Sequence, residues 1–450
     1  PGERDGWVTH RYVQGDVHDF AFTADSRTAP PLEAKWTGPG SPEVSVRVLF
    51  PPEYAHNAPR VLKATLDSLS YFSKTLGPYP YKTVTAVIPP FNAEEAGGME
   101  YPTFFTASSY ADDEEGTMNA YQLDFVTIHE FGHGYFYGIL ASNEFEEPML
   151  DEGLNEFWNL RMIRERGQAI PARTLNSKRL GLGSDVPAFD FERSFSVVGE
   201  PADPLGQNSW NRHSSASYGS VYGRTATALR DLESVLGKEV LEKAFMAYYE
   251  RWKFRHPTVA DLQAVLAEVS GEPAAVAGLF ERHIYAAQKI DDRVDKLVSE
   301  EVLPLKGQIL AEGKRTERDT EAFDALVEKT RKDWDQAHPD AAPGTGPYPW
   351  RSTVVLRRYG AAVPQTVRVT FEDGSVELAV WDNQDRWQQF SWVKASKVVS
   401  AELDPTYAHA MDTRWLDNSR SLKADRAAAR RWSLEGASLF QTLFALVSTL

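Results

Sequence analysis

The first 50 residues contain apolar positions that cluster or alternate with a period of two, a spacing that is typical of β-strands. These positions fall in four short segments, at 7–9, 12–13, 19–22 and 44–48. A loop rich in proline and glycine, from Ala29 to Pro42, separates the third segment from the fourth. Because four short strands make an incomplete sheet, we expect residues 1–50 to be the C-terminal part of an N-terminal β domain, or strands that join the next domain.

After residue 50 the apolar residues recur at intervals of three and four, which predicts helices. The predicted helices cover about 59–76, 121–140, 151–165, 222–236 and 258–271, with one short strand at 83–88. Thr258 and Asp261 have the spacing of a helix-capping pair, and Gly271 marks the end of that helix. Residues 173–217 lack a clear period, so we expect a long surface excursion there. These elements predict a single domain over 51–300.

The C-terminal third of the chain returns to strand periodicity after a charged stretch. Residues 301–347 are highly charged and end in a Pro- and Gly-rich run, which is typical of a linker or an insertion. Beyond this run, apolar residues alternate on both sides of Asp373-Gly374, and this pattern predicts a β-hairpin with a tight turn. We therefore expect a small β-sandwich over 348–415.

Residues 416–450 predict a C-terminal helix. Its basic start is followed by residues 434–450, in which Glu435 carries the only charge. A membrane-spanning helix needs about 20 apolar residues, so this shorter stretch favours a docked or interfacial helix. A truncated membrane anchor is the alternative, and with it membrane association through this segment. The apolar end and the missing start favour an extracytoplasmic or cell-envelope location, with or without membrane association.

Composition narrows the class of protein. The chain has 450 residues, of which 42% are hydrophobic and 25% charged, values that are ordinary for a globular protein of two or three domains. A net charge of −16 argues against a nucleic-acid partner, which would need a basic face. The absence of cysteine excludes disulfides and zinc–thiolate sites, so any metal must bind to histidine and carboxylate ligands.

His129, Glu130 and His133 form an HExxH motif within one predicted helix. Positions i and i+4 lie on one face of a helix, so the two imidazoles can be directed at a single cation with Glu130 beside it. The alternative is two histidines on an amphipathic helix without a metal. Glu152 argues against this alternative, because the eighteen intervening residues allow a second helix to bring its carboxylate to the same cation.

Two histidines and one carboxylate leave the fourth tetrahedral position open, as in catalytic rather than structural zinc sites. Asn155 and Glu156, one turn beyond Glu152, are candidates for groups that orient the ligands. Metzincin proteases are excluded by spacing, because Phe136 and Ile139 occupy the positions of their glycine and third histidine.

The motif and its spacing resemble the gluzincin aminopeptidases of the aminopeptidase N type, which include leukotriene-A hydrolase. The resemblance rests on His129 to His133, then eighteen residues, then Asp151-Glu152-Gly153. Gly97-Gly98-Met99-Glu100-Tyr101 is similar to the family's GxMEN exopeptidase motif, and Val221-Tyr222-Gly223-Arg224 to its Tyr-x-Lys-Gly segment. The resemblance implies an α+β multidomain protein. Its thermolysin-like, mostly helical catalytic domain would lie between the end of an N-terminal β domain and a C-terminal β-sandwich.

The resemblance also implies the reaction and the role of each residue. One zinc ion bound by His129, His133 and Glu152 would activate a water, Glu130 would be the general base, and Tyr222 would stabilise the oxyanion. Tyr218 is a competitor for the last role. The substrate-binding residues would be Gly97, Gly98, Met99 and Glu100, with Glu100 binding the free N-terminal amine of a peptide.

Departures from the family pattern leave alternatives open. Tyr101 replaces the family's asparagine, and Arg224-Thr225 replaces its Lys-Gly. The family's second amine-binding side chain comes from an N-terminal domain that is mostly outside this chain. The leading hypothesis is a zinc aminopeptidase. The alternatives are a zinc endopeptidase, a bifunctional enzyme like leukotriene-A hydrolase, and a peptide-binding scaffold without turnover.

Overall fold

The computed structural model describes residues 2–4, 6–172, 184–341, 345–424 and 426–447. It divides the chain into two compact units, Pro1–Lys289 and Ile290–Leu450. The sequence suggested a boundary near residue 300 instead. The difference arises because the strand at Asp292–Glu301 pairs with the strand at Trp350–Arg358 in the C-terminal unit. Its backbone hydrogen bonds are therefore made in that unit, although it follows the helices of the N-terminal unit directly in the sequence. Each unit is described separately below.

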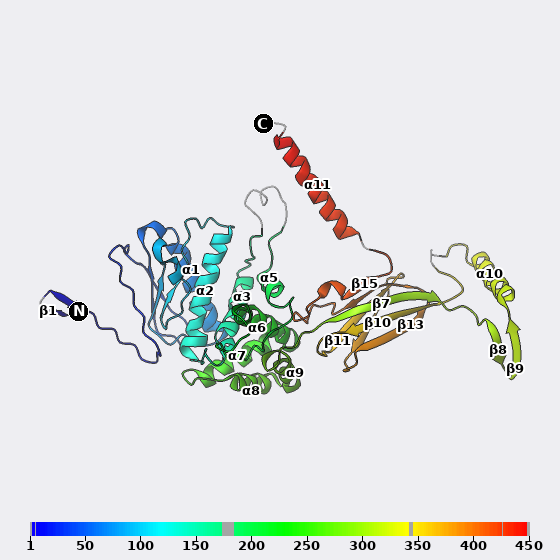
Figure 1. Ribbon diagram of the computed structural model, residues 1–450, viewed down its shortest axis with the longest axis horizontal. Helices are drawn as coiled ribbons and strands as arrows, with labels where there is room; N and C mark the ends of the chain where they lie inside the picture. The colour runs from blue at the N-terminus through cyan, green and yellow to red at the C-terminus, as the bar shows by residue number, and fades with distance from the viewer. Residues whose placement is uncertain (1, 5, 173–183, 342–344, 425, 448–450) are drawn as a thin grey trace. The chain divides into compact units, whose positions relative to one another are not determined.

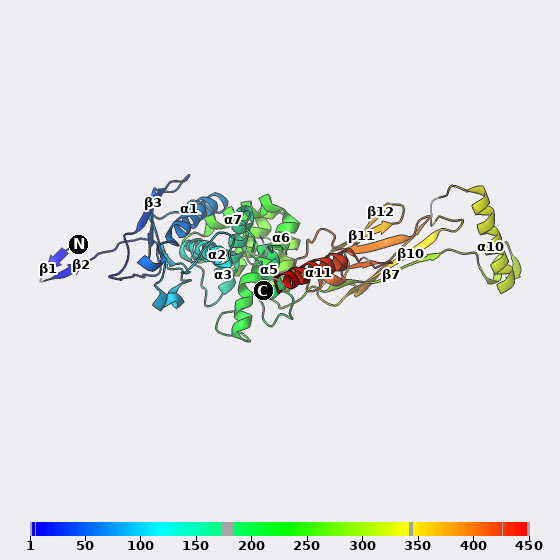
Figure 2. The same cartoon turned by 90° about the horizontal axis from the view of Figure 1, so that it is seen from above.

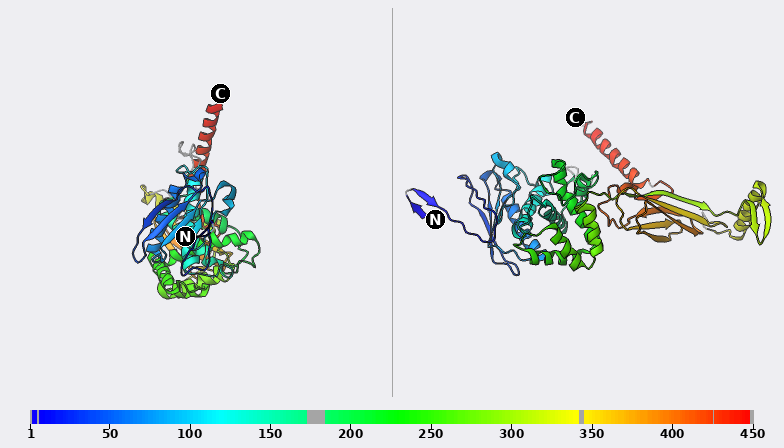
Figure 3. Two further views of the ribbon diagram at one scale, coloured as in Figure 1. Left: turned by 90° about the vertical axis from the view of Figure 1, so that its left-hand side faces the viewer. Right: turned by 60° about the horizontal axis from the view of Figure 1, so that its bottom comes forward.

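The N-terminal unit contains a four-stranded sheet in the order β3-β4-β5-β6, which faces the viewer in the left panel of Figure 3. β3 (Leu32–Trp36) runs antiparallel to β4 (Val44–Leu49), while β5 (Thr83–Val87) and β6 (Phe104–Thr106) continue the sheet in parallel. β3 and β4 therefore join the strands of the next domain, which is one of the two arrangements expected from the sequence.

The first 50 residues depart from the sequence prediction in two places. β3 lies within the stretch predicted as a loop, because the alternating Leu32, Ala34 and Trp36 find a partner strand in β4. The segments at 12–13 and 19–22 form no strand and their aromatic side chains are exposed. Apolar alternation forms a strand only where a neighbouring strand completes its hydrogen bonds. β1 (Gly2–Arg4) and β2 (Trp7–Thr9) pair only with each other.

Two long helices connect the sheet to the rest of the unit. α1 (Ala58–Thr75) contacts both β4 and α2 (Met118–His133), and the two helices lie side by side in Figures 1 and 2. The predicted helix at 121–140 is confirmed for α2, but it continues as a wider π-helical segment, η3 (Gly134–Ile139). α3 (Glu152–Glu165) then packs against α2; it begins one residue after the predicted start at 151 and ends where the sequence predicts.

The remaining helices of this unit follow the sequence more loosely. They are α5 (Ala188–Ser196), α6 (Ser215–Leu236), α7 (Lys238–Trp252), α8 (Val259–Ser270) and α9 (Pro273–Leu279), with η5 (Phe280–Ile284) after them. The capping box of Thr258 and Asp261 is confirmed. The predicted surface excursion is wrong for α5, which packs against α6; residues 173–183 of that segment lie outside the described residues. Short 3-10 turns, η1 (Pro52–Tyr54), η2 (Phe91–Ala96) and η4 (Pro148–Leu150), complete the unit.

The C-terminal unit is built on two antiparallel sheets around one core. One sheet has the order β13-β10-β7, with β7 at Asp292–Glu301, β10 at Trp350–Arg358 and β13 at Trp387–Lys394. The other has the order β12-β11-β14-β15 and comprises β11 (Gln365–Phe371), β12 (Val376–Trp381), β14 (Val398–Leu403) and β15 (Ser419–Ser421). Buried side chains of both sheets form a single cluster, and the hairpin predicted around Asp373-Gly374 is confirmed between β11 and β12.

The charged stretch before the sandwich is folded rather than a plain linker. It contains the hairpin of β8 (Gly307–Ala311) and β9 (Lys314–Arg318), followed by α10 (Thr320–Ala337). After η6 (Trp415–Asp417), the chain ends in α11 (Ala427–Val447). Within the described residues, no helix combines the length and the apolar character needed to cross a membrane.

Candidate active site

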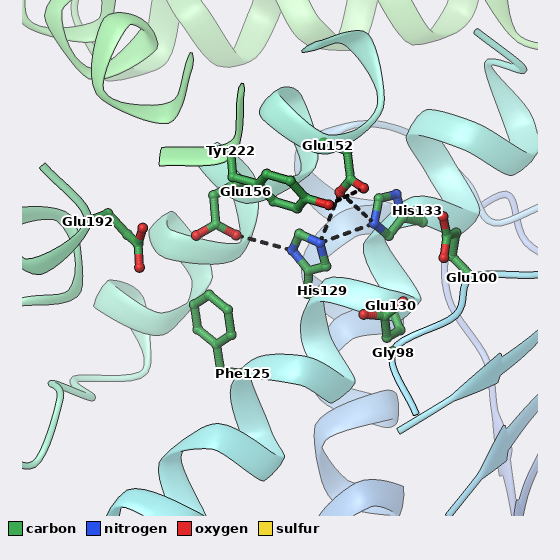
Figure 4. Close-up of a pocket in the computed structure, with 10 residues that line it drawn as sticks. All are labelled: Gly98, Glu100, Phe125, His129, Glu130, His133, Glu152, Glu156, Glu192 and Tyr222. Carbon is green, nitrogen blue, oxygen red and sulfur yellow. Dashed lines mark hydrogen bonds and ion pairs between the residues drawn. The ribbon is translucent and has the colours of Figure 1, made fainter. Parts of the chain in front are cut away.

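The side chains of His129, His133 and Glu152 converge at the junction of α2 and α3. The two Nε2 atoms lie 3.1 Å apart, and Glu152 Oε2 lies 3.4 Å from that of His129 and 3.3 Å from that of His133. All three residues are buried, with at most 8% exposed. The helical spacing of four residues brings the imidazoles to one face, and the start of α3 adds the carboxylate (Figure 4).

These distances fit a metal ion better than a set of hydrogen bonds. A tetrahedral ion with bonds of about 2.0–2.1 Å separates its ligand atoms by about 3.3 Å. Glu152 Oε2 forms no hydrogen bond in the described part of the chain, although both imidazole nitrogens are near it. One ligand atom from each residue faces the others, and the three atoms lie within 4.8 Å of one another. The residues present therefore fit a divalent cation.

The outer nitrogen of each imidazole faces a second carboxylate. His133 Nδ1 lies 2.5 Å from Asp151 Oδ1, and His129 Nδ1 lies 3.1 Å from Glu156 Oε2. Carboxylates at these positions fix the tautomer that leaves Nε2 free for a metal. Asn155 donates a hydrogen bond of 2.7 Å to the backbone oxygen of His129, so both polar residues singled out beyond Glu152 contact the first histidine.

The carboxylates favour positive charge at the centre of the cluster. Burial opposes a charged imidazole, but contacts with Glu152 and Glu156 outweigh it and raise the pKa of His129 to about 10. Burial likewise opposes charge on His133, yet Asp151 holds the pKa of that imidazole well above its usual range. Burial opposes charge on Glu152 as well, but its contacts with the imidazoles of His129 and His133 outweigh burial and lower its pKa. A metal cation would supply the positive charge that these groups favour.

Two glycines allow the helices to approach closely enough for this cluster. A Cβ atom on Gly132 would come within 1.9 Å of Asn155 Oδ1, so the glycine in the HExxH motif permits the contact between α2 and α3. A Cβ atom on Gly153 would lie 2.5 Å from Thr225, so this glycine brings α6 against α3. α6 carries Tyr222, which is why this approach also shapes the pocket.

Glu130 lies beside the cluster and has no hydrogen-bond partner for Oε2 among the described residues. Its side chain is buried, and burial raises its pKa to about 7, with the neighbouring histidines acting in the opposite direction. A carboxylate with this pKa can take up and release a proton near neutral pH. Glu130 therefore has the position and the acidity of a general base.

Three carboxylates gather on one side of the cluster. Oxygen atoms of Glu100, Glu144 and Asp151 lie within 4.8 Å of one another. Burial raises the pKa of Glu100 and of Glu144, and Asp151 Oδ2 has no hydrogen-bond partner in the described residues. Such an arrangement favours a cationic ligand such as an ammonium group.

The segment that carries Glu100 is held by the edge strand β6. Met99 donates its backbone N–H to Thr106 Oγ1 and accepts from the backbone of the same residue. Gly98 and Glu100 line the pocket, whereas Gly97 and Met99 are not among its lining residues. A Cβ atom on Gly97 would lie 2.8 Å from the backbone oxygen of Ala107, so a glycine at this position lets the segment pack closely against that backbone.

Tyr222 reaches the cluster from α6, and its hydroxyl donates a hydrogen bond to Glu152 Oε1. Burial and the charge of Glu152 raise its pKa, so the phenol keeps its proton at neutral pH. Tyr218 lies one turn earlier, because α6 begins at Ser215 rather than at 222. Tyr222 lines the pocket and Tyr218 does not. The guanidinium of Arg224 instead donates to backbone oxygens of Ser196 and Gln288.

The cluster lies in the middle of a pocket of about 370 Å³. Figure 4 shows Gly98 and Glu100 on one side of the histidines and Phe125, Glu156 and Glu192 on the other. The sequence had assigned no role to Phe125, Glu144 or Glu192. Phe125 could have been noticed because it lies one helical turn before His129, whereas Glu144 and Glu192 carry no local signal.

Comparisons with known proteins indicate the family to which the chain is related. Residues 60–283 match the model of the peptidase family M1 domain. The chain is 25% identical over 213 residues to Aminopeptidase M1-C of Oryza sativa subsp. japonica, a match that covers 44% of this chain and 22% of that protein. It is 24% identical over 248 residues to Aminopeptidase 2 of Candida albicans, covering 51% of this chain and 24% of that protein.

A solved structure shares the fold. The crystal structure of Legionella pneumophila aminopeptidase A in complex with aspartic acid matches with a TM-score of 0.55 and 11% identity, over 86% of this chain and 38% of that chain. The chain spans about a quarter of the length of the curated relatives that it matches. The family model covers the helices that carry the metal-ligand cluster, Glu130 and Tyr222. The chain therefore belongs to peptidase family M1.

Proposed function

We propose that this protein is a zinc aminopeptidase that removes N-terminal residues from peptides. The proposal rests mainly on one arrangement. The carboxylates of Glu100, Glu144 and Asp151 lie next to the metal-ligand cluster, and the buried Glu130 lies beside the same cluster. The curated relatives named above are both called aminopeptidases, which supports the same reaction.

The metal proposed is one zinc ion held by His129, His133 and Glu152. Two imidazoles and one carboxylate are the donor set of catalytic zinc sites, and their mutual distances of 3.1–3.4 Å suit its tetrahedral geometry. When bound there, zinc would lower the pKa of water and polarise a carbonyl. Asp151 and Glu156 would keep the two imidazoles in the tautomer that binds it.

Glu130 acts as the general base in this proposal. Its carboxylate accepts a proton from the water that attacks the scissile carbonyl, and then delivers this proton to the leaving amine. A pKa of about 7 suits both transfers, because the group can hold and release the proton at neutral pH.

Tyr222 stabilises the negative charge that develops on the carbonyl oxygen. Its raised pKa keeps the phenolic proton in place, so the hydroxyl is a donor throughout the reaction. In the structure this hydroxyl donates to Glu152, and a small rotation of the side chain would redirect it to the substrate.

Glu100 binds the free N-terminal ammonium group, and Glu144 provides a second carboxylate next to it. An ammonium group held there is two bonds away from the first carbonyl of the peptide. This short distance limits cleavage to the first peptide bond, because no longer segment fits between the anchor and the metal ligands.

The experiment that tests the proposal compares free and N-acetylated alanyl anilides, each with and without a chelator. We expect hydrolysis of the free substrate only, its loss with the chelator, and its recovery when zinc is restored. Cleavage of the acetylated substrate at a similar rate would favour an endopeptidase. Peptide binding without hydrolysis in the zinc-loaded protein would favour a non-catalytic scaffold.

A further inference from the structure

We propose that the pocket selects peptides with lysine or arginine at the second position, and that Glu192 determines this selectivity. This inference rests on the proposed aminopeptidase function and concerns the part of the pocket on the far side of the histidines. That part, which we call the distal end, is formed by Phe125, Glu156 and Glu192.

The direction in which a substrate lies follows from the two groups that hold it. The ammonium group binds near Glu100 and the scissile carbonyl lies at the metal ligands, so the chain beyond that carbonyl leads away from Glu100. In Figure 4 the far side of His129 is occupied by the distal end. The side chain of the second residue therefore enters the distal end.

The charge balance of the pocket leaves the distal end negative. Among the described residues, five glutamates and no lysine or arginine line the pocket. A divalent cation offsets two of the five charges, those of Glu152 and Glu130, and the substrate ammonium offsets that of Glu100. The charges of Glu156 and Glu192 then remain at the distal end. A cationic side chain would balance them in a partly buried site where screening by water is weak.

Glu192 is built into the wall of the pocket and has no cationic partner in the part of the chain that the structure describes. It extends from α5, and its Oε2 packs against α6, where a Cβ atom on Gly223 would come within 2.9 Å. In the described residues its carboxylate makes no hydrogen bond and no ion pair. Burial and the nearby charge of Glu156 raise its pKa to about 7, as expected for a carboxylate without a counter-ion.

Phe125 suits the rest of a long cationic side chain. Its ring lines the pocket and is nearly parallel to that of His129, with 6.3 Å between the ring centres and an angle of 9° between the planes, so Phe125 contributes an apolar aromatic surface beside the metal-ligand cluster. Lysine and arginine pack their methylene groups along such surfaces and extend their charge beyond them. The charge would then meet Glu192. Glu156 already faces His129 Nδ1, which leaves Glu192 as the free carboxylate.

The test compares the zinc-loaded full chain on three substrates, Ala-Lys-amide, Ala-norleucine-amide and Ala-Glu-amide. Norleucine has the methylene chain of lysine without its charge. We expect kcat/KM for the lysine peptide to exceed that for the norleucine peptide by roughly 10- to 100-fold, the range of a hydrogen bond to a charged group. The glutamate peptide should be the poorest substrate.

Glu192→Gln should abolish the preference for lysine, so that the ratio of kcat/KM for the lysine and norleucine peptides falls to about one. Thermal unfolding of the variant, compared with that of the wild type, reports whether it is folded. Glu192→Lys should reverse the preference towards the glutamate peptide. Glu200→Gln, at an exposed carboxylate outside the pocket, is the matched control and should keep the lysine preference.

Equal rates for the lysine and norleucine peptides in the wild-type protein would overturn the inference while leaving aminopeptidase activity in place. A lysine preference that survives in Glu192→Gln would overturn the role of Glu192. Failure to hydrolyse any of the three peptides would overturn the proposed function, and the inference with it.

Discussion

At the centre of the pocket, the outer nitrogens of His129 and His133 each face a carboxylate, and Asn155 anchors the backbone of α2. At the two ends, by contrast, Glu100 and Glu192 line the pocket as carboxylates without a cationic partner in the described residues. The centre therefore has its supporting partners within the chain, whereas the carboxylates at the two ends would need positive charge from a ligand to balance them.

This difference separates two tasks of the site. Partners within the chain fix the imidazoles in one geometry, which a metal ion requires. Unpaired carboxylates at the ends remain available, and a substrate with matching positive charge would replace the solvation they lose on burial. Substitutions at the centre should therefore affect turnover or metal binding for every substrate. Substitutions at the ends should affect the choice among substrates.

The largest effect is expected for Glu130→Gln. Removing the base while keeping the shape of the side chain should lower kcat for free alanyl anilide by about 10²- to 10⁴-fold. The bound zinc, measured by metal analysis after dialysis, should stay at one per chain. Glu95→Gln, at an exposed acid, is the control and should keep wild-type kcat. A variant at Glu130 that retains most of its turnover would show that another group is the base.

Tyr222→Phe should have the next largest effect. Loss of one donor to the developing oxyanion should lower kcat by about 10²- to 10³-fold with little change in KM, because the contact strengthens only in the transition state. Steady-state kinetics of Tyr222→Phe and Tyr218→Phe on the same substrate make the comparison. If Tyr218→Phe loses more activity than Tyr222→Phe, the two assignments must be exchanged.

Glu100→Ala tests the amine end. We expect kcat/KM for the free alanyl anilide to fall by roughly 10- to 100-fold, the range for a lost hydrogen bond to a charged group. Zinc content should not change, since Glu100 is not a ligand in the proposed cluster. Glu144→Gln should give a smaller fall in the same direction. An unchanged ratio of activities on free and acetylated substrates would contradict the anchor at this end.

The smallest effect on turnover is expected for Asp151→Asn in excess zinc. The amide keeps an oxygen opposite His133 Nδ1 but removes the negative charge, so zinc affinity should fall about 10- to 100-fold. Competition with a chromophoric chelator measures this affinity directly. Glu146→Gln, an exposed acid of the same loop, should bind zinc as the wild type does. Equal affinity in Asp151→Asn and wild type would mean that Asp151 does not support the ligand.

The fold could be predicted from the sequence where a local period marks the element. The amphipathic helix at 58–75 and the hairpin around Asp373-Gly374 were both found, because their apolar spacing and turn residues lie within a few positions of one another. β3 was missed because proline and glycine surround it, and β7 was assigned to the wrong unit because its partner β10 begins about 50 residues later.

The sequence by itself also determined the centre of the site. His129 and His133 are four residues apart, and residues at this spacing share a face in every α-helix. The eighteen residues before Glu152 are enough for the chain to turn and start a second helix next to the first. Only the tertiary structure decided which further residues join them. Glu144 comes from a loop, and Glu192 from a helix of nine residues in a stretch without clear periodicity. Their approach depends on packing between distant elements, and such packing leaves no periodic pattern in the chain.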